Sequence, residues 1–250
     1  MKLKANNPVL SRIEKFSGEY EYAAYNAATY KGVAKKSFIF VATALFGALL
    51  GILMLINNKQ MLVGGSIVII LATFISGFVA FANPRAAKIA GIIYSLFEGM
   101  FLGAVSVIFQ DLYPGAVLGA LLGTVSVALI VSTLYFSSIV KVNGKFVRVL
   151  LIAVISFIFT QLIILILNLI FPAVITPLIS NFGVQLLISG IVILIASLYL
   201  MFDLEQIRQV VEGGQPKEME WYVAFGIVYT ILWLYIEMLR LVALVLSKRD

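Results

Sequence analysis

Seven long apolar runs are the feature that most constrains how this chain can fold. Each holds about 20 mostly uncharged residues, the length an α-helix needs to cross the roughly 30 Å hydrocarbon core of a bilayer. The runs cover residues 37–56, 61–82, 88–110, 116–140, 149–171, 183–207 and 221–246. Of the 250 residues, 62% are hydrophobic, against roughly 45–50% in soluble domains. The sequence predicts an all-α integral membrane protein, a bundle of seven transmembrane helices.

The segments between the runs predict how the chain is divided and oriented. Residues 1–36 are polar and rich in tyrosine, which favours the headgroup zone. We therefore expect an interfacial N-terminal arm over residues 1–36 and a membrane domain over residues 37–250. With a cytoplasmic N-terminus, nearly all loop Lys and Arg residues face inward and only Lys59, Lys248 and Arg249 lie outside, as the positive-inside rule favours. The spans leave no soluble basic face for nucleic acid.

The chain contains neither cysteine nor histidine. Disulfides, thiolate or imidazole metal sites, Ser-His and Cys nucleophiles, and imidazole pH switches are therefore excluded. Carboxylates are left as the groups that could sense pH. An intramembrane aspartyl protease would need a close acid dyad, and the Gly-x-Gly-Asp segment typical of such enzymes is missing. We expect a protein that is not an enzyme and holds no cofactor.

Three carboxylates lie inside apolar runs: Glu98, Asp203 and Glu237. An ionisable group inside a span costs roughly 2.5–3.5 kcal/mol on insertion scales, so it usually faces a partner, a cavity or an ion path. Asp203 lies on the apolar face of its helix, whereas Glu205 is expected to be the solvated acid. Glu237 is expected to lie on the order of 10 Å deeper than Asp203.

Each acid also has a structural interpretation. Asp203 could mark a helix end, and Glu237 could form a local ion pair with Arg240, three residues further on. Glu98, close to Gly99, could accept a hydrogen bond from a Ser, Thr or Tyr, or could bind a proton or cation. Small residues recur four apart within the runs, which predicts close helix packing. These pairs are Gly47 and Gly51, Gly99 and Gly103, and Gly119 and Gly123.

Two segments near the C-terminus resemble a known family. Residues 198–207, LYLMFDLEQI, and residues 234–241, LYIEMLRL, are similar to the signature segments of the Bax inhibitor-1 (transmembrane BAX inhibitor motif) family. Residues 98–103, 7–8 and 29–33 resemble its bacterial branch with an extended N-terminal arm. The resemblance implies a seven-helix bundle around a central last helix in a bacterial plasma (inner) membrane, with a pH-sensing carboxylate pair that gates a calcium leak.

The resemblance also implies roles for single residues. Asp203 takes the place of the first family aspartate and Glu237 that of the second, with one more methylene. As oxygen ligands they would suit transient binding of Ca²⁺. The arginine that latches the pair in the family has two candidates here, Arg85 and Arg240, while Glu98 stays a candidate for the ion pathway or for a structural role.

These observations predict a pH-sensitive Ca²⁺ leak channel. Asp203 and Glu237 would share a proton when close, and loss of that proton would repel them unless a cation enters. Two alternatives remain open: a proton-coupled transporter, and a regulator that binds and restrains a protease or death-pathway partner through its N-terminal arm. The expected partners are the lipid bilayer, Ca²⁺, protons and, in the second alternative, a membrane protein.

Overall fold

The computed structural model describes residues 27–57 and 59–248, and these residues form helices with no strand of more than an isolated bridge. Most of the predicted arm, including its residues 7–8, lies outside the described residues. The helices are α2 (Tyr30–Asn57), α3 (Lys59–Ala82), α4 (Ala87–Leu112), α5 (Ala116–Phe136), α6 (Gly144–Ile170), α7 (Pro172–Ile179), α8 (Phe182–Glu212) and α9 (Met219–Leu246). Among them, seven are long and apolar enough to cross a membrane, which confirms the predicted fold class.

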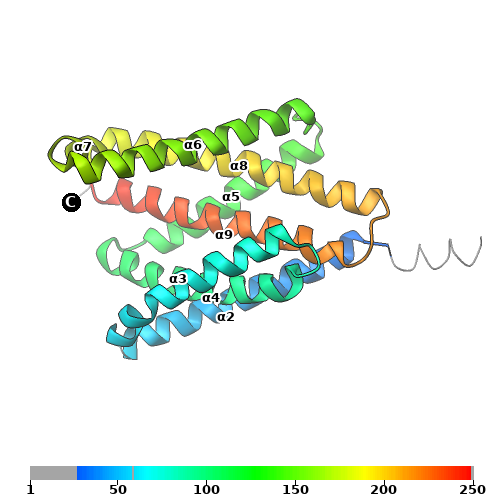
Figure 1. Ribbon diagram of the computed structural model, residues 1–250, viewed down its shortest axis with the longest axis horizontal. Coiled ribbons are helices and arrows are strands. Elements are labelled where there is room, and N and C mark those ends of the chain that lie inside the picture. Colours follow the sequence, from blue (N-terminus) through cyan, green and yellow to red (C-terminus); the bar gives the residue numbers. More distant parts are fainter. Residues whose placement is uncertain (1–26, 58, 249–250) are drawn as a thin grey trace, which may run out of the picture.

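The long helices run back and forth along one axis of an elongated bundle (Figure 1). At one end, which we call the basic end, α2 begins, α8 ends and α9 begins. The α3–α4 and α5–α6 connections lie there too, and with them come Arg85, Lys141 and Lys217. At the opposite end lie α7 and the end of α9 (Figure 1). The basic end is the one that the charge pattern predicts to be cytoplasmic.

Several helix ends differ from the predicted runs. Helix α2 begins at Tyr30 and α8 continues to Glu212, so polar residues at the basic end are helical. Helix α5 ends at Phe136, before the predicted residue 140. Pro172 and Pro177 do not leave an irregular connection, because Pro172 occupies the first turn of the short helix α7, where its missing N–H costs nothing. Helical hydrogen bonding therefore extends beyond the apolar runs.

The last helix lies in the centre of the bundle. Helix α9 packs against α2, α3, α4, α5 and α8, which confirms its predicted central place. Phe225 on α9 is completely buried and its ring makes edge-on contacts with Phe40 of α2, Phe81 of α3 and Tyr94 of α4, at centroid distances of 6.0, 5.0 and 5.2 Å. Such aromatic contacts add specificity to apolar burial. Phe225 thereby fixes three helices around α9.

Helices α2 and α4 approach each other through glycines on both sides. Gly47 and Gly51 of α2 face the backbone of α4, and Gly99 and Gly103 of α4 face the backbone of α2. A methyl group at any of these four positions would overlap a backbone carbonyl oxygen of the other helix. The predicted close packing is confirmed here within one chain, because only glycine leaves room for the two backbones.

Candidate functional site

Asp203 lies where α8 crosses α9. Its side chain is only 6% exposed, and its Oδ2 accepts a hydrogen bond of 2.5 Å from the Thr230 hydroxyl. Gly226, one turn before Thr230 on α9, faces the other carboxylate oxygen, and an added Cβ there would lie 3.3 Å from it. Asp203 is thus a helix-crossing residue rather than a helix-end marker. Its partner is a neutral hydroxyl, and within the described residues no cation pairs with it.

Glu237 lies on α9 two helical turns beyond Thr230, a rise of about 10 Å. Because Asp203 bonds to Thr230, the structure does not bring the carboxylates of Asp203 and Glu237 together. The nearest cation to Glu237 is Arg240, with 3.7 Å between guanidinium nitrogen and carboxylate oxygen. That distance is too long for a hydrogen bond, and the same oxygen, Oε2, is buried with no hydrogen-bond partner among the described residues.

Glu98 borders a cavity of about 570 Å³ between α3, α4 and α9. Thr73 and Tyr229 line the same cavity, and the Thr73 hydroxyl is buried without a hydrogen-bond partner in the described part of the chain. Within residues 27–57 and 59–248, the Glu98 carboxylate accepts no hydrogen bond from a neighbouring Ser, Thr or Tyr. The structure therefore places Glu98 beside space rather than in a satisfied polar contact.

Asp203 and Glu98 lie at a similar level on different sides of α9. Thr230 contacts Asp203, and its chain neighbour Tyr229 lines the Glu98 cavity. Tyr229 in turn packs against Tyr94 of α4 with ring centroids 5.4 Å apart. Asp203 and Glu98 thus lie against two different faces of the central helix α9. They lie at a similar level along the bundle axis, whereas Glu237 lies at a different level.

The two arginine candidates lie far from Asp203 along the bundle. Arg85 is exposed in the α3–α4 connection at the basic end, where its backbone N–H donates to the Asn83 side chain. Arg240 lies toward the opposite end of α9, is 62% exposed and borders a small cavity of about 260 Å³ between α6, α8 and α9. Neither contacts the Asp203 carboxylate, and only Arg240 approaches a predicted site residue.

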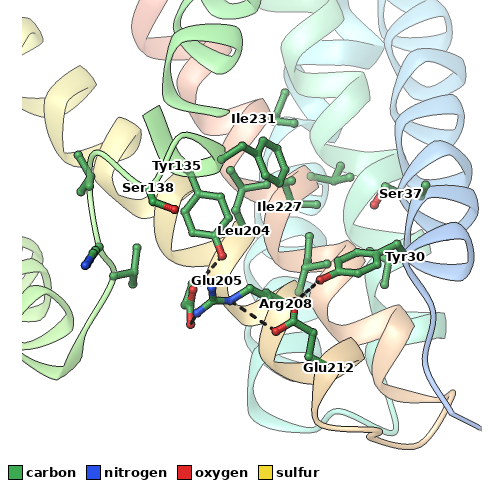
Figure 2. Close-up of a pocket in the computed structure, with 18 of the residues that line it drawn as sticks. Tyr30, Ser37, Tyr135, Ser138, Leu204, Glu205, Arg208, Glu212, Ile227 and Ile231 are labelled. Atoms are coloured by element: carbon green, nitrogen blue, oxygen red, sulfur yellow. Dashed lines mark hydrogen bonds and ion pairs between the residues drawn. The ribbon is translucent and has the colours of Figure 1, made fainter. Parts of the chain in front are cut away.

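Glu205 is buried, so the expectation that it is solvated was wrong. Figure 2 shows its carboxylate held between two helices. Tyr135 of α5 donates a hydrogen bond of 2.8 Å, and Arg208 and Gln209 of α8 donate bonds of 2.9 and 3.0 Å. Helical spacing correctly turned Glu205 away from Asp203, but α5 covers that face of α8. A single sequence contains no signal for this cover.

Glu220 is a second buried acid that the sequence did not single out. Its side chain is 0% exposed and forms a 2.6 Å ion pair with Lys36 of α2. The backbone N–H and hydroxyl of Thr29 also donate to it, at 2.8 and 3.2 Å. Gly32 lies against the carboxylate so closely that a Cβ would overlap it. In the sequence, Glu220 reads as part of a polar connection. Its partners cannot be recognised there because they lie about 190 residues away.

Comparison with family models matches residues 7–247 to the family described as Bax inhibitor 1 like. The match covers nearly the whole chain, including every described helix. Comparison with curated proteins finds no match. The family match and the seven candidate spans together identify the chain as an integral membrane protein.

Proposed function

Because the chain belongs to the Bax inhibitor 1 like family, which is linked to Ca²⁺ leak and pH sensing, we propose that it is a pH-sensitive Ca²⁺ leak channel controlled by Asp203. One observation carries this proposal: a buried carboxyl joins α8 to the central helix α9 through a neutral hydroxyl alone. That contact contains no cation among the described residues to balance a negative charge.

Protonation of Asp203 would decide the state of the α8–α9 contact. A protonated carboxyl is neutral and stays bonded to Thr230 at little electrostatic cost. A deprotonated carboxylate in the same apolar surroundings needs a counter-ion, because an unpaired buried charge is strongly disfavoured. The channel therefore closes when Asp203 is protonated, and a cation enters when the proton leaves. Oxygen ligands favour hard cations such as Ca²⁺.

The other two acids extend the proposed pathway. Glu237 lies on α9 beyond the Thr230 contact with Asp203, toward the opposite end, and acts as a second transient Ca²⁺ ligand rather than as a proton-sharing partner in the closed state. Arg240, within 3.7 Å, competes with the ion for Glu237. Glu98, beside its cavity on the other face of α9, is a third candidate ligand. No three Asp or Glu side chains cluster within the described residues, which suits passage better than tight binding.

Ca²⁺ flux into proteoliposomes, measured across pH with purified variants, tests this proposal. Wild-type flux should rise with pH as Asp203 loses its proton. In Asp203→Asn the side chain keeps its shape but cannot ionise, so flux should be low and independent of pH. Glu237→Gln should lower flux but keep its pH dependence. Glu218→Gln, in the exposed α8–α9 connection, is the matched control. Unchanged flux in both Asp203→Asn and Glu237→Gln would contradict the proposal.

A further inference from the structure

A cavity lies at the basic end, beside the α8–α9 contact. It measures about 830 Å³ and is bordered by α2, the end of α5 and its connection to α6, α8 and α9. Helices α2 and α5 do not contact each other anywhere in their described lengths, so the cavity fills the space between them. Both helices are candidate membrane spans, so a gap between them can admit a lipid from the side.

The depth of the cavity corresponds to one leaflet. Along α9, the apolar run begins at residue 221 and the cavity wall reaches Ile231, a rise of about 15 Å. A single leaflet contributes about half of the roughly 30 Å hydrocarbon core. The cavity thus begins at the level of the headgroups and ends near the middle of the membrane. A lipid acyl chain that spans one leaflet has a comparable length.

The cavity wall changes from polar to apolar with depth (Figure 2). At the rim lie Tyr30, Lys141, Arg208 and Glu212, whereas most deeper positions are apolar, among them Ile231, with Ser37 and the fully paired Glu205 as the polar ones. An occupant that satisfies both ends must itself be amphiphilic, with its polar group at the basic end.

The charged residues at the rim determine which polar headgroup an occupant of the cavity can have. Glu205 is already held by three donors, so it offers nothing to a ligand. Glu212 is 64% exposed, accepts one hydrogen bond from Tyr30 and lies 4.0 Å from Arg208. Lys141 is exposed and forms no ion pair with the described residues. The rim therefore presents the exposed Glu212 carboxylate, which Arg208 approaches to 4.0 Å, beside Lys141, a cation that forms no ion pair with the described residues.

From this arrangement we infer that the cavity binds one phospholipid with a primary-amine headgroup, such as phosphatidylethanolamine, from the leaflet at the basic end. Its ammonium group meets Glu212, its phosphate meets Lys141, and an acyl chain lies along α2 toward Ile231. A lipid with only negative charge would leave Glu212 facing a like charge. A choline headgroup has no N–H group that could donate a hydrogen bond to the carboxylate. This inference does not depend on ion conduction.

Native mass spectrometry of the full chain in mild detergent tests the inference. After delipidation, phosphatidylethanolamine, phosphatidylglycerol and phosphatidylcholine are added in equal amounts. The wild type should retain about one phosphatidylethanolamine per chain, favoured by about fivefold or more over the other two, a typical effect of one charged contact. Equal retention of the three lipids, or no lipid that survives mild activation, would overturn the inference.

Two variants separate this cavity from ordinary lipid contact. Ala34→Trp places an indole in the space between α2 and α5, since Ala34 is exposed and lines the cavity; it should abolish retention. Ala42→Trp, two turns further on α2, exposed and outside the cavity lining, should retain lipid like the wild type. Glu212→Gln should keep lipid binding but lose the preference for the primary amine. Retention by Ala34→Trp, loss in Ala42→Trp, or an unchanged preference in Glu212→Gln would each contradict the inference.

Discussion

The buried carboxylates of the bundle have two opposite kinds of surroundings. Glu220 and Glu205 each meet a cation within 3 Å and further donors. Asp203 meets one hydroxyl, and Glu98 faces a cavity. A buried charge that is paired and hydrogen-bonded is fixed in place, whereas one without a cation can exchange a proton or accept an ion. Glu220 and Glu205 therefore hold the helices together, whereas Asp203 and Glu98 are the acids at which chemistry can change.

The Glu220 cluster also ties the beginning of α2 to the α8–α9 connection. Thr29 and Lys36 reach Glu220, and Ala27 and Ala28 pair with Pro216 and Gln215 through the backbone. These contacts join the start of α2 to the connection between α8, which carries Asp203, and α9, which carries Thr230. The proton exchange proposed for Asp203 thus takes place on helices whose ends are held in position by the Glu220 contacts.

Removal of one partner at Glu220 should give the largest loss of stability. In Glu220→Ala the buried ammonium of Lys36 loses its counter-ion, so we expect a loss of about 3 kcal/mol in the free energy of unfolding. Thermal unfolding in detergent measures the change. Glu218→Ala, two residues earlier and exposed, is the control. If Glu220→Ala unfolds at the control's temperature, the basic end is not a structural lock.

Loss of the hydroxyl at Thr230 should have a smaller effect on stability. Thr230→Val removes the single hydrogen bond to Asp203, and a buried neutral hydrogen bond contributes about 1 kcal/mol. Thr124→Val is a matched control, because the Thr124 hydroxyl is also buried but bonds only to a carbonyl of its own helix. A loss at Thr230 as large as that at Glu220 would mean that Asp203 is locked like the acids at the basic end.

Neutralisation of Arg240 should have the smallest effect. Its guanidinium is 62% exposed and lies 3.7 Å from Glu237, and exposed ion pairs contribute about 0.2–1 kcal/mol. Arg240→Gln should therefore shift the unfolding temperature by little, while Ca²⁺ flux should increase because Glu237 loses a competing cation. Arg148→Gln, exposed at the start of α6, is the control for a lost surface charge. A large loss of stability would identify Arg240 as a structural latch.

Much of the fold follows from the sequence because helix formation in a membrane is local. Each span needs only its own length of apolar residues, and the glycine pairs at Gly47 and Gly99 mark a close crossing without reference to any other residue. The sequence did not predict the short helix α7, because a proline at a helix start cannot be told from a proline in a connection. The helical continuation of α8 to Glu212 was missed because its last turns are polar.

The candidate site was predictable only in part. Apolar surroundings in the sequence identified Glu98, Asp203 and Glu237 as intramembrane acids, but the partner of each depends on how far every helix is rotated and shifted against α9. Resemblance suggested Glu237 as the counterpart of Asp203, whereas the crossing of α8 over α9 places Thr230 there. Thr230 is an uncharged residue in an apolar run and carries no signal of its own.

The sequence by itself determined that this chain spans a membrane seven times and which acids lie within the spans, since both depend on the residues of one segment. Only the tertiary structure decided which acids are paired with cations. Lys36 reaches Glu220 across 184 positions and Tyr135 reaches Glu205 across 70, distances over which no local pattern extends. Asp203 is left with a hydroxyl because of where two helices cross, and that crossing is a property of the whole bundle.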